Sequence, residues 1–518
     1  MPEIVAEPVV VTPAEPQNQT EVFAVHGADP EVLAYAMAKY SRSALSMKES
    51  LKEISSQRAE QFLNTFYFQY GHRSIADLAH IAFAIERLSL LAAISLVDEQ
   101  RWDGQERSTR YQNFKKSGWY MPDFGADRSA AQLYRTSVEG LFTAYHELAE
   151  GMFESLTKQV AKPSEMKQES YDRTLRARAF DVARYLLPLA TNTSLGQIVN
   201  ARTLETQVSR LLSSPHAEIR QLGERLRGAA TGPAWNVHAE ELGKLQQEVA
   251  ALDPALGAKA EALLMREVKT APTLVKYAAQ NNYEIETKRE LAQAVADLMK
   301  DEAIAPAPVV DLVERKESLE GEIAATLLYG ASHYSYRQLR DAVSSLNEAR
   351  INEVIALGTR HRGRHDELLR EFSAGQNLRF DILMDIGGFR DMHRHRRCVQ
   401  IIQRYTTAHG YDIPEGVSEA GLQPLYESAV QAAHDAHDKL GTDSADYILP
   451  LGTRMRALFK MDFAEAVYIS ELRSQPQGHF SYRRVAWKMY EAVKKQHPAL
   501  AQHFRVTDVN EPVDMLKR

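Results

Sequence analysis

The sequence predicts a helix-rich protein built from two similar halves, and three observations support this prediction. Apolar residues recur at spacings near three and four over most of the 518-residue chain, which is the spacing of an amphipathic helix. One pattern of charged and aromatic residues occurs twice along the chain. Between the two occurrences, residues 301–308 contain paired prolines and show no periodicity, as expected of a domain boundary.

These features predict a first domain at residues 21–303 and a second at residues 309–518. Residues 1–20 are rich in Pro, Glu and Val, and they lack the basic start and the apolar segment of a signal peptide. We therefore expect these residues to form a disordered tail.

Apolar spacing predicts the helices in order along the chain. In residues 71–97 the apolar side chains recur at helical intervals, which predicts one long, largely buried helix. The same criterion predicts further helices at 130–159, 171–186, 204–227, 239–249, 288–300, 317–328, 351–357, 422–440 and 481–495.

The repeated pattern has nearly the same internal spacing in both halves. Gly71-His72-Arg73-Ser74 precedes Tyr111, and Arg364-His365 precedes Tyr405. The distance from His72 to Tyr111 is 39 residues, and that from His365 to Tyr405 is 40. Later pairs, such as Pro188 with Pro450, lie closer in sequence than Tyr111 with Tyr405. This difference predicts an insertion in the first half, within residues 115–180.

Composition excludes several classes of protein. A net charge of -7 and a pI near 6.2 argue against a general nucleic-acid binder, so an anion site has to come from local clusters of Arg or Lys. Cys398 is the only cysteine, which excludes intrachain disulfides and metal sites made of several cysteines. The longest apolar run, residues 88–97, is too short to span a bilayer. We expect a cytoplasmic protein without nucleic-acid or membrane partners.

Two clusters of residues could bind an anion. Residues 390–404 hold five arginines, two histidines and one acid, a composition that suits the phosphates of a flavin or nucleotide. The alternative is a solvated basic face. In the segment from Glu106 to Arg110, a hydroxyl lies two residues before an arginine, which suits a phosphate if the backbone turns there. Arg202 could be a further anion contact, although Asn200 could simply cap a helix.

Other chemistries remain open at this point. Cys398 lies among arginines that could acidify a thiol, but a single buried cysteine more often serves as a small apolar side chain. His361 and His365 are four residues apart, and His434 and His437 are three apart, as in helix-borne metal sites of a phosphohydrolase. No acidic partner lies at a suitable spacing, so we predict no metal.

Taken together, these residues resemble the flavin-dependent thymidylate synthase family. The family pattern contains Gly-His-x-Ser, Arg-His-Arg, Ser-x-Arg-Tyr, Asn-Ala-Arg and Glu-Ile-Arg, and the order and spacing agree as well as the residues. The resemblance covers most of residues 25–230 and again 325–505. It implies a helix-rich α+β fold with two tandem domains of this family, and a homodimer that imitates a tetramer of single domains.

In the first half, the resemblance assigns roles in binding the substrate and in catalysis. The residues matched to the nucleotide-phosphate loop are Glu106, Ser108 and Arg110. Arg202 matches a second nucleotide arginine, Asn200 a flavin contact, and Arg220 the arginine near the pyrimidine ring. Arg220 and Ser108 would be the catalytic residues. Asp98-Glu99-Gln100 stands where the family has Arg-His-Arg.

In the second half, the resemblance assigns cofactor-binding roles. Arg394, His395 and Arg396 restore the Arg-His-Arg triplet, and Arg483 matches the ring-proximal arginine. The Ser-x-Arg loop is two residues shorter, and Asp462-Phe463-Ala464 replaces Asn-Ala-Arg. Each half thus lacks what the other retains, so we expect one composite site between the two domains.

The implied activity is methylation of deoxyuridylate to thymidylate with methylenetetrahydrofolate, FAD and NADPH, so the expected partners are a pyrimidine nucleotide and a folate. Because Asp98 and Glu99 are expected to repel a flavin pyrophosphate, two alternatives stay open. One is a flavoenzyme that acts on another pyrimidine nucleotide. The other is a non-catalytic homologue that binds nucleotides or serves as a scaffold.

Overall fold

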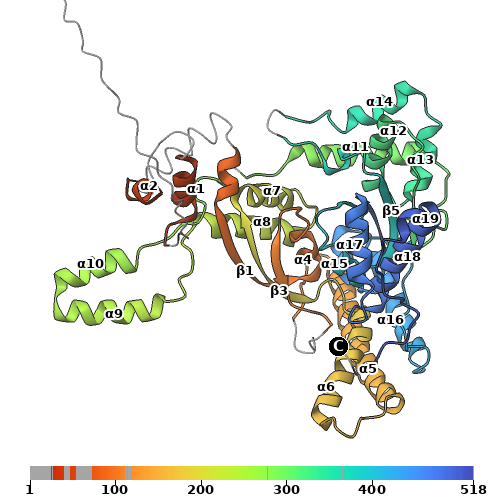
Figure 1. Cartoon of the computed structure of the whole chain (residues 1–518), viewed down its shortest axis with the longest axis horizontal. Helices are drawn as coiled ribbons and strands as arrows, with labels where there is room; N and C mark the ends of the chain where they lie inside the picture. The colour runs from red at the N-terminus through yellow and green to blue at the C-terminus, as the bar shows by residue number, and fades with distance from the viewer. Residues whose placement is uncertain are drawn as a thin grey trace, which may run out of the picture.

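The computed structural model describes residues 25, 27–39, 47–53, 73–110, 114, 118–276, 278–363 and 366–516. The predicted tail at residues 1–20, the two His-containing pairs at 71–72 and 364–365, and Tyr111 lie outside the described residues. The described part is a helix-rich α+β fold with two small antiparallel sheets, which confirms the predicted fold class (Figure 1).

The first half contains a three-stranded antiparallel sheet in the order β1, β3, β2. Its strands are β1 (His80–Ser89), β2 (Asp103–Glu106) and β3 (Asn192–Asn200). Its helices are α1 (Pro30–Lys39), α2 (Met47–Glu53), η2 (Arg73–Leu78), α4 (Leu90–Leu96), α5 (Arg128–Gln159), α6 (Gln168–Ala183), η3 (Arg184–Leu186), α7 (Ala201–Leu212), α8 (Ala217–Thr231), α9 (Ala239–Leu252) and α10 (Pro254–Leu264).

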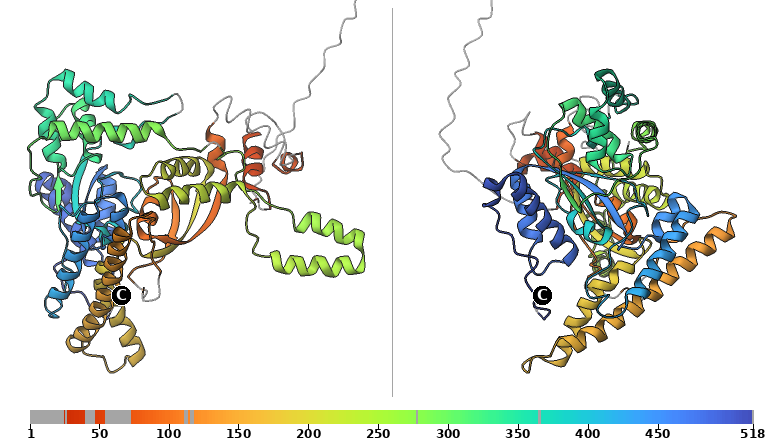
Figure 2. Two further views of the ribbon diagram at one scale, coloured as in Figure 1. Left: turned by 180° about the vertical axis from the view of Figure 1, so that it is seen from behind. Right: turned by 90° about the vertical axis from the view of Figure 1, so that its right-hand side faces the viewer.

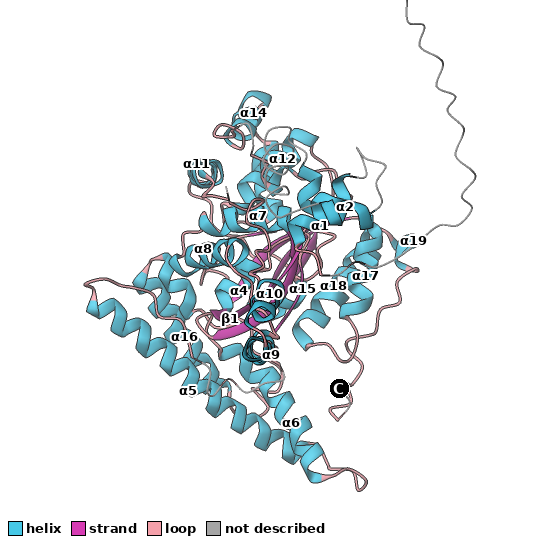
Figure 3. Ribbon diagram, turned by 90° about the vertical axis from the view of Figure 1, so that its left-hand side faces the viewer, coloured by secondary structure: helices cyan, strands magenta, loops and turns pink. Residues whose placement is uncertain are grey.

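The second half contains a four-stranded antiparallel sheet in the order β4, β5, β7, β6. Its strands are β4 (Val310–Leu312), β5 (Leu378–Asp385), β6 (Val399–Ile402) and β7 (Arg454–Met461). The helices from residue 282 onward are α11 (Asn282–Leu298), α12 (Leu319–Gly330), α13 (Tyr336–Ser344), α14 (Glu348–Leu357), η4 (Arg370–Phe372), α15 (Ile386–Met392), α16 (Gln423–Leu440), η5 (Asp443–Ile448), α17 (Phe463–Arg473), α18 (Phe480–Gln496) and α19 (Pro498–Ala501). Helices lie on either side of the strands in the view of Figure 3.

The two halves share one order of elements around their sheets. In the first half the order is β1, α4, β2, α5, α6, η3, β3, α7, α8, and in the second it is β5, α15, β6, α16, η5, β7, α17, α18. Helix α6 has no equivalent, and α5 has 32 residues where α16 has 18, in agreement with the insertion predicted within residues 115–180. Residues at the same place in these two orders are called counterparts below.

The halves meet along a seam of reciprocal backbone hydrogen bonds between residues 185–190 and 447–452. The amide of Leu189 donates to the carbonyl of Leu449 at 2.9 Å, and the amide of Leu451 donates to the carbonyl of Leu187 at 3.0 Å. A second pair of bonds repeats this exchange one residue further along the seam. Such reciprocity is the property of a twofold interface, here formed within one chain. Next to the seam, α5 and α16 pack side by side (Figure 2).

The prediction of one long helix over residues 71–97 was wrong. The described residues of this segment form η2, the strand β1 and the short helix α4. In β1, Ile81 and Ile85 are buried while Ala82 and Ala84 are exposed, so a period of two overrides the helical spacing. Ser89 then starts α4, because its side chain accepts a hydrogen bond from the amide of Ala92 at 2.9 Å.

The prediction of one helix over residues 204–227 was also wrong. The structure has two helices there, α7 and α8, which are separated by residues 213–216. Pro215 lies in this break, and proline cannot donate the backbone hydrogen bond that a continuous helix needs.

Two segments between residues 233 and 300 are arranged differently from one another. Helices α9 and α10 form a hairpin that projects from the body, and α9 has no buried residue (Figure 1). Helix α11 instead buries Leu291 and Val295 in a core that it shares with α12 and α13 of the second half. The helix before the predicted boundary at 301–308 therefore already packs on the second half.

A pair of side chains ties the start of α4 to α8, and another pair ties the start of α15 to α18. Glu218 accepts hydrogen bonds from the amide and the hydroxyl of Ser89, at 2.9 and 2.6 Å. In the second half the roles are exchanged, because Ser481 donates to Asp385, the N-cap of α15. Burial, helped by the charge of Asp412, raises the pKa of Asp385 to about 6.

We expect Asp385→Asn to stabilise the protein increasingly as the pH rises. The folded state favours protonated Asp385, so this contribution to stability is complete below the ordinary pKa near 3.8 and is lost as the pH rises through about 6. Relative to wild type, the free energy of unfolding of the variant should therefore gain about 1 kcal/mol between pH 5 and pH 7.5. Urea unfolding at the two pH values measures this difference.

The matched control is Asp462→Asn at the N-cap of α17. The carboxylate of Asp462 is exposed, and its hydrogen bond from the amide of Glu465 lowers its pKa. Since this carboxylate is ionised at both pH values, the control should show no change over the same range. An equally pH-independent difference for the Asp385 variant would contradict the assignment.

Candidate functional site

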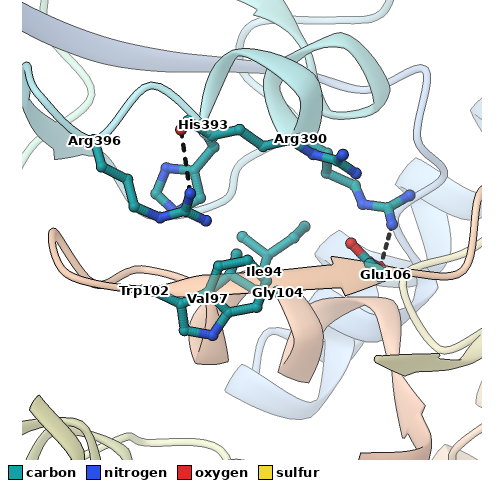
Figure 4. Close-up of a pocket in the computed structure, with 9 residues that line it drawn as sticks. Ile94, Val97, Trp102, Gly104, Glu106, Arg390, His393 and Arg396 are labelled. Atoms are coloured by element: carbon teal, nitrogen blue, oxygen red, sulfur yellow. Dashed lines mark hydrogen bonds and ion pairs between the residues drawn. The ribbon is translucent and has the colours of Figure 1, made fainter. Parts of the chain in front are cut away.

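A pocket lies where the two halves meet, and we call it the first pocket. It holds about 350 Å³ of empty space, part of which is open to solvent. The first half contributes one wall and the second half faces it (Figure 4). The lining residues are Ile94, Val97, Trp102, Gly104 and Glu106 from the first half, and Arg390, His393, Arg394 and Arg396 from the second.

Strand β2 and the residue that leads into it form the floor of the first pocket. The indole nitrogen of Trp102 donates to Gln197 of β3 at 2.6 Å, which fixes the plane of the ring. A side chain at Gly104 would collide with this ring and with the carbonyl oxygen of Gly196, so only glycine fits there. Glu106 ends β2 and is directed at the second half.

Arg396 is a half-buried cation with few partners in the described part of the chain. Its guanidinium lies 4.5 Å from the centre of the Trp102 ring, and one of its nitrogens donates to the carbonyl of Arg394 at 3.2 Å. Its other two nitrogens have no hydrogen-bond partner among the described residues. Burial lowers the pKa of Arg396, although the charges of Asp103 and Asp98 act in the opposite direction.

Arg390, on α15, links the two walls of the first pocket. It forms an ion pair with Glu106 and donates to the hydroxyl of Thr109 at 3.3 Å. Its Nε has no hydrogen-bond partner among the described residues. An anion that entered the pocket would therefore meet donors of both Arg390 and Arg396 that no described group uses.

A second pocket of about 240 Å³ lies beside the first, and His393 and Arg396 line both. The second pocket is lined by Val97, Asp98, Glu99 and Gln100 from the first half, and by Arg370, His393, Arg396, Cys398 and Gln400 from the second. Residues 98–100 are the counterparts of Arg394 to Arg396, because both triplets lie between a short helix and the next strand. Each pocket thus combines the triplet of one half with the strand region that follows the counterpart triplet in the other half.

The two pockets differ in charge. In the second pocket, Arg370 pairs with Asp98 at 2.6 Å, and Arg210 of α7 pairs with Glu99 at 2.8 Å. Although burial opposes ionisation of Asp98, the charges of Arg370, His393 and Arg210 lower its pKa well below the usual range. Both carboxylates of the altered triplet are therefore held by arginines within the protein.

His393 lies between the two pockets. Its Nδ1 is 2.8 Å from the amide oxygen of Gln400, and its ring stacks on Phe389. Its Nε2 lies 3.6 Å from Asp98 and has no hydrogen-bond partner among the described residues. Burial lowers the pKa of His393, so the neutral ring is favoured despite the nearby carboxylate.

Of the residues predicted from the sequence, the structure brings Glu106, Arg394 and Arg396 together around the first pocket. This is the composite arrangement expected from the sequence, since the Glu106 segment and the cationic triplet form opposite walls (Figure 4). The remaining predicted residues do not line either pocket, and they are Ser108, Arg110, Asn200, Arg202, Arg220, His395 and Arg483.

Arg110 is engaged within the protein. Its guanidinium binds Asp181 through two hydrogen bonds of 2.8 and 3.1 Å, and it also donates to the hydroxyl of Tyr482 at 3.0 Å. The hydroxyl of Ser108 accepts a hydrogen bond from the amide of Arg110 at 3.2 Å. In this structure Arg110 therefore links its own segment to α6 of the first half and to α18 of the second half.

The residues predicted on α7 and α8 have structural partners. Asn200 caps α7, since its side chain accepts from the amide of Thr203 at 2.8 Å, as the capping alternative predicted. Arg202 pairs with Asp77 at 3.3 Å and with Glu367 of the second half at 3.6 Å. Arg220 is exposed and donates to the carbonyls of residues 214 and 215 at 2.8 and 2.6 Å.

His395 and Arg483 are buried behind the first pocket's cationic wall. His395 accepts a hydrogen bond from Arg473 at 2.7 Å, and burial next to arginines lowers its pKa to about 3. Arg483 donates to the carbonyl of Ser474 at 3.0 Å. Arg473 and Arg210 both lie in the last turn of counterpart helices, so each holds the middle residue of its triplet.

The alternative chemistries find little support in the described residues. Cys398 is buried, and burial raises the pKa of its thiol to about 12, which suits a small apolar side chain better than a nucleophile. In the described part of the chain, no three His, Cys, Asp or Glu side chains gather as a metal site. Within the same part, no helix is long and apolar enough to cross a membrane.

Reasoning from the sequence missed Trp102, His393 and Arg370 as pocket residues. His393 was visible in the cluster at 390–404 but had no assigned role. Trp102 stands alone in a polar stretch, and only its contact with Arg396 shows its importance. Arg370 carries no sequence signal, because its partner Asp98 lies 272 residues away in the chain.

Comparisons with known proteins match two segments of the chain to one family. The family model described as thymidylate synthase complementing protein matches residues 23–231 and 318–499. A UPF0159 protein of Chlamydia muridarum is 27% identical over 514 residues, covering 93% of this chain and 91% of that protein. A UPF0159 protein of Thermoplasma acidophilum is 26% identical, covering 92% and 95% respectively.

Matches to proteins named for an activity are shorter. A flavin-dependent thymidylate synthase of Clostridium tetani is 25% identical over 177 residues, which is 34% of this chain and 67% of that protein. The structure of the flavin-dependent thymidylate synthase of Helicobacter pylori with FAD and dUMP aligns with a TM-score of 0.27 and 17% identity. It covers 39% of this chain and 89% of that one. The family model matches two segments that together make up most of the chain, and this chain therefore belongs to the thymidylate synthase complementing protein family.

Proposed function

We propose that the protein binds FAD in the first pocket and methylates deoxyuridylate to thymidylate there, with methylenetetrahydrofolate as the carbon donor and NADPH as the reductant. The single observation that carries this proposal is the convergence of Glu106, Arg394 and Arg396, from opposite halves of the chain, on one pocket. We also propose that residues 21–303 and 309–518 are two fused thymidylate synthase-like domains, and that two chains form a homodimer.

The residues of the first pocket fit a flavin nucleotide. Arg390 and Arg396 offer buried N–H groups that lack partners among the described residues, and such groups suit a pyrophosphate. Arg394 adds an exposed cation at the same wall. Trp102, with Ile94 and Val97, supplies an apolar and aromatic floor of the kind that suits a planar ring.

When bound and reduced, FAD would supply the hydride that completes the transferred methyl group. The chain's own residues would bind and orient. Arg394 and Arg396 would hold the anionic part of the cofactor against Trp102, and Glu106 would keep Arg390 directed at the pocket through their ion pair. The buried position of these charges would strengthen their effect on a bound anion.

The pyrimidine nucleotide would use residues of the first half. The resemblance assigns Ser108, Arg110 and Arg202 to its phosphate and Arg220 to its ring. For Arg110 to take part, the phosphate would have to replace Asp181, which now holds two of its nitrogens. Arg202 is one-third exposed and could exchange Asp77 for a phosphate at lower cost.

A second candidate function is a homologue that binds nucleotides without catalysis or serves as a scaffold. The contacts of Arg110 with Asp181, Tyr482 and the carbonyl of residue 477 favour this second candidate. They occupy the guanidinium that the resemblance assigns to the nucleotide phosphate. A flavoenzyme acting on another pyrimidine nucleotide would retain the first pocket and differ only in the nucleotide site.

FAD binding tests the first step of the proposal. We expect Arg396→Ala to weaken FAD binding by about 10- to 100-fold, because a charge-assisted hydrogen bond contributes about 1.5–3 kcal/mol. The thermal midpoint of the variant should equal or exceed that of wild type, since it loses a half-buried cation whose charged form is disfavoured by burial. Titration followed by flavin absorbance, together with thermal unfolding, measures both effects.

The control is Arg397→Ala. Arg397 is the next residue in the same cationic segment, but it is exposed and pairs with Asp462 outside the pocket. This variant should bind FAD as wild type does. If both variants bound FAD equally well, or if wild type bound none, the assignment of the first pocket would be wrong.

Growth of a thymidine-requiring bacterium tests the activity itself. The wild-type gene should restore growth without thymidine, and Arg396→Ala should not, whereas Arg397→Ala should. Arg202→Ala should also fail if this residue binds the nucleotide. If the wild-type protein binds FAD but does not restore growth, thymidylate synthesis is rejected and an enzyme for another nucleotide is favoured. If it neither binds FAD nor restores growth, the non-catalytic homologue is favoured.

A further inference from the structure

We propose that Asp98 and Glu99 act as built-in anions that fill the second pocket, so that each chain takes one phosphate-bearing ligand instead of two. This inference rests on the proposed function of the first pocket. It assigns to the second pocket a role in excluding a ligand and in holding the two halves together.

The first argument is the equivalence of the two pockets. The reciprocal seam relates the halves by a twofold, so the fold offers two places where a triplet of one half faces the strand region of the other. Two ligand sites per chain would follow from backbone symmetry alone. The difference between them lies in the side chains.

The second argument is the inversion of charge at counterpart positions. Arg394 in the first pocket corresponds to Asp98 in the second, and His395 corresponds to Glu99. If the second site were simply lost through disuse, neutral residues could replace its cationic triplet. Here, instead, carboxylates occur where a phosphate would otherwise be bound. Each carboxylate also has a matching arginine, which Arg370 and Arg210 provide.

The third argument is that Arg370 and Arg210 already hold the carboxylates of Asp98 and Glu99. Arg370 donates to the carboxylate of Asp98 at 2.6 Å, to the carbonyl of Asp98 at 3.1 Å and to that of Gln400 at 3.2 Å. Arg210 places both Nε and one terminal nitrogen on a single oxygen of Glu99, at 3.0 and 2.8 Å. A phosphate in the second pocket would have to compete with Asp98 for Arg370, and it would meet the repulsion of both carboxylates.

The electrostatic environments of Arg370 and Arg396 agree with this difference. The charge of Asp98 raises the pKa of Arg370, so this cation already has its counter-ion. Burial lowers the pKa of Arg396, whose Nε and one terminal nitrogen have no partner among the described residues. An added anion would therefore relieve Arg396 and gain little from Arg370.

The Asp98–Arg370 pair also joins the two halves. Asp98 follows α4 of the first half, and Arg370 begins η4 of the second. An internal ion pair needs no ligand, so it holds this side of the interface whether or not the first pocket is occupied. The second pocket thus acts as a fixed support for the first.

The experiment compares wild type with the double variant Asp98→Asn, Glu99→Gln, using inorganic pyrophosphate as the probe and isothermal titration calorimetry as the measurement. The substitutions keep the size of both side chains but remove their charges, which leaves Arg370 and Arg210 without counter-ions. We expect one pyrophosphate per chain for wild type and two for the double variant. Adding Arg390→Ala, which changes an arginine that lines the first pocket but not the second, should reduce the number to one.

The control is Asp446→Asn, which removes an ion pair between the halves at a different place, with His216 at 3.0 Å. The Asp446→Asn variant should still bind one pyrophosphate per chain. This result would show that the site gained by the double variant is not a general effect of a weakened interface. A wild type that binds two, or a double variant that gains no site over wild type, overturns the inference.

The outcome also separates this inference from the proposed function. A change from no bound pyrophosphate to one would support the exclusion by Asp98 and Glu99 and reject the first pocket as an anion site. If circular dichroism shows that the double variant does not fold, Asp98→Asn alone is measured, since it frees Arg370, which lines the second pocket, and keeps the Glu99–Arg210 pair. A second, weaker binding event is then expected, and its absence overturns the inference.

Discussion

The exchange of backbone hydrogen bonds between residues 185–190 and 447–452 is the constraint on which the composite site depends. Each half donates to and accepts from the same stretch of the other, so the orientation of the halves is set by main-chain groups and tolerates changes in side chains. Once this seam is formed, β2 of the first half faces the residues after α15, and the region of β6 faces the residues after α4. Both pockets are consequences of one interface.

Fusion of two related halves allows the pockets to differ. In a dimer of identical chains, a substitution in one triplet would appear in both, and the two sites would change together. Here residues 98–100 and 394–396 vary independently, so one triplet can keep its cations while the other supplies carboxylates. The same backbone geometry then supports a cation-rich pocket on one side and a closed network of ion pairs on the other.

Most buried polar groups around the seam are paired, and this gives the exceptions their meaning. Glu218 holds Ser89 in one half, and Ser481 holds Asp385 in the other, so the pairing is kept although donor and acceptor are exchanged. Arg110 is likewise saturated by Asp181 and Tyr482. Arg184, next to the seam, also keeps two nitrogens without a partner among the described residues, but those of Arg396 belong to a residue that lines the first pocket, where a ligand could reach them.

The sequence by itself determined the helix-rich class, the two-part organisation and the complementary loss of motifs, because these depend on periodicity and on the order of residue types. It could not reveal that residues 80–89 form a strand, since only pairing with β3 decides between the two periodicities. Nor could it show that Asp98 is neutralised by Arg370, or that Arg110 is bound by Asp181, because these partners are distant in the chain. Which charges stay available for a ligand was decided by the tertiary structure, since availability depends on what else lies within hydrogen-bond distance.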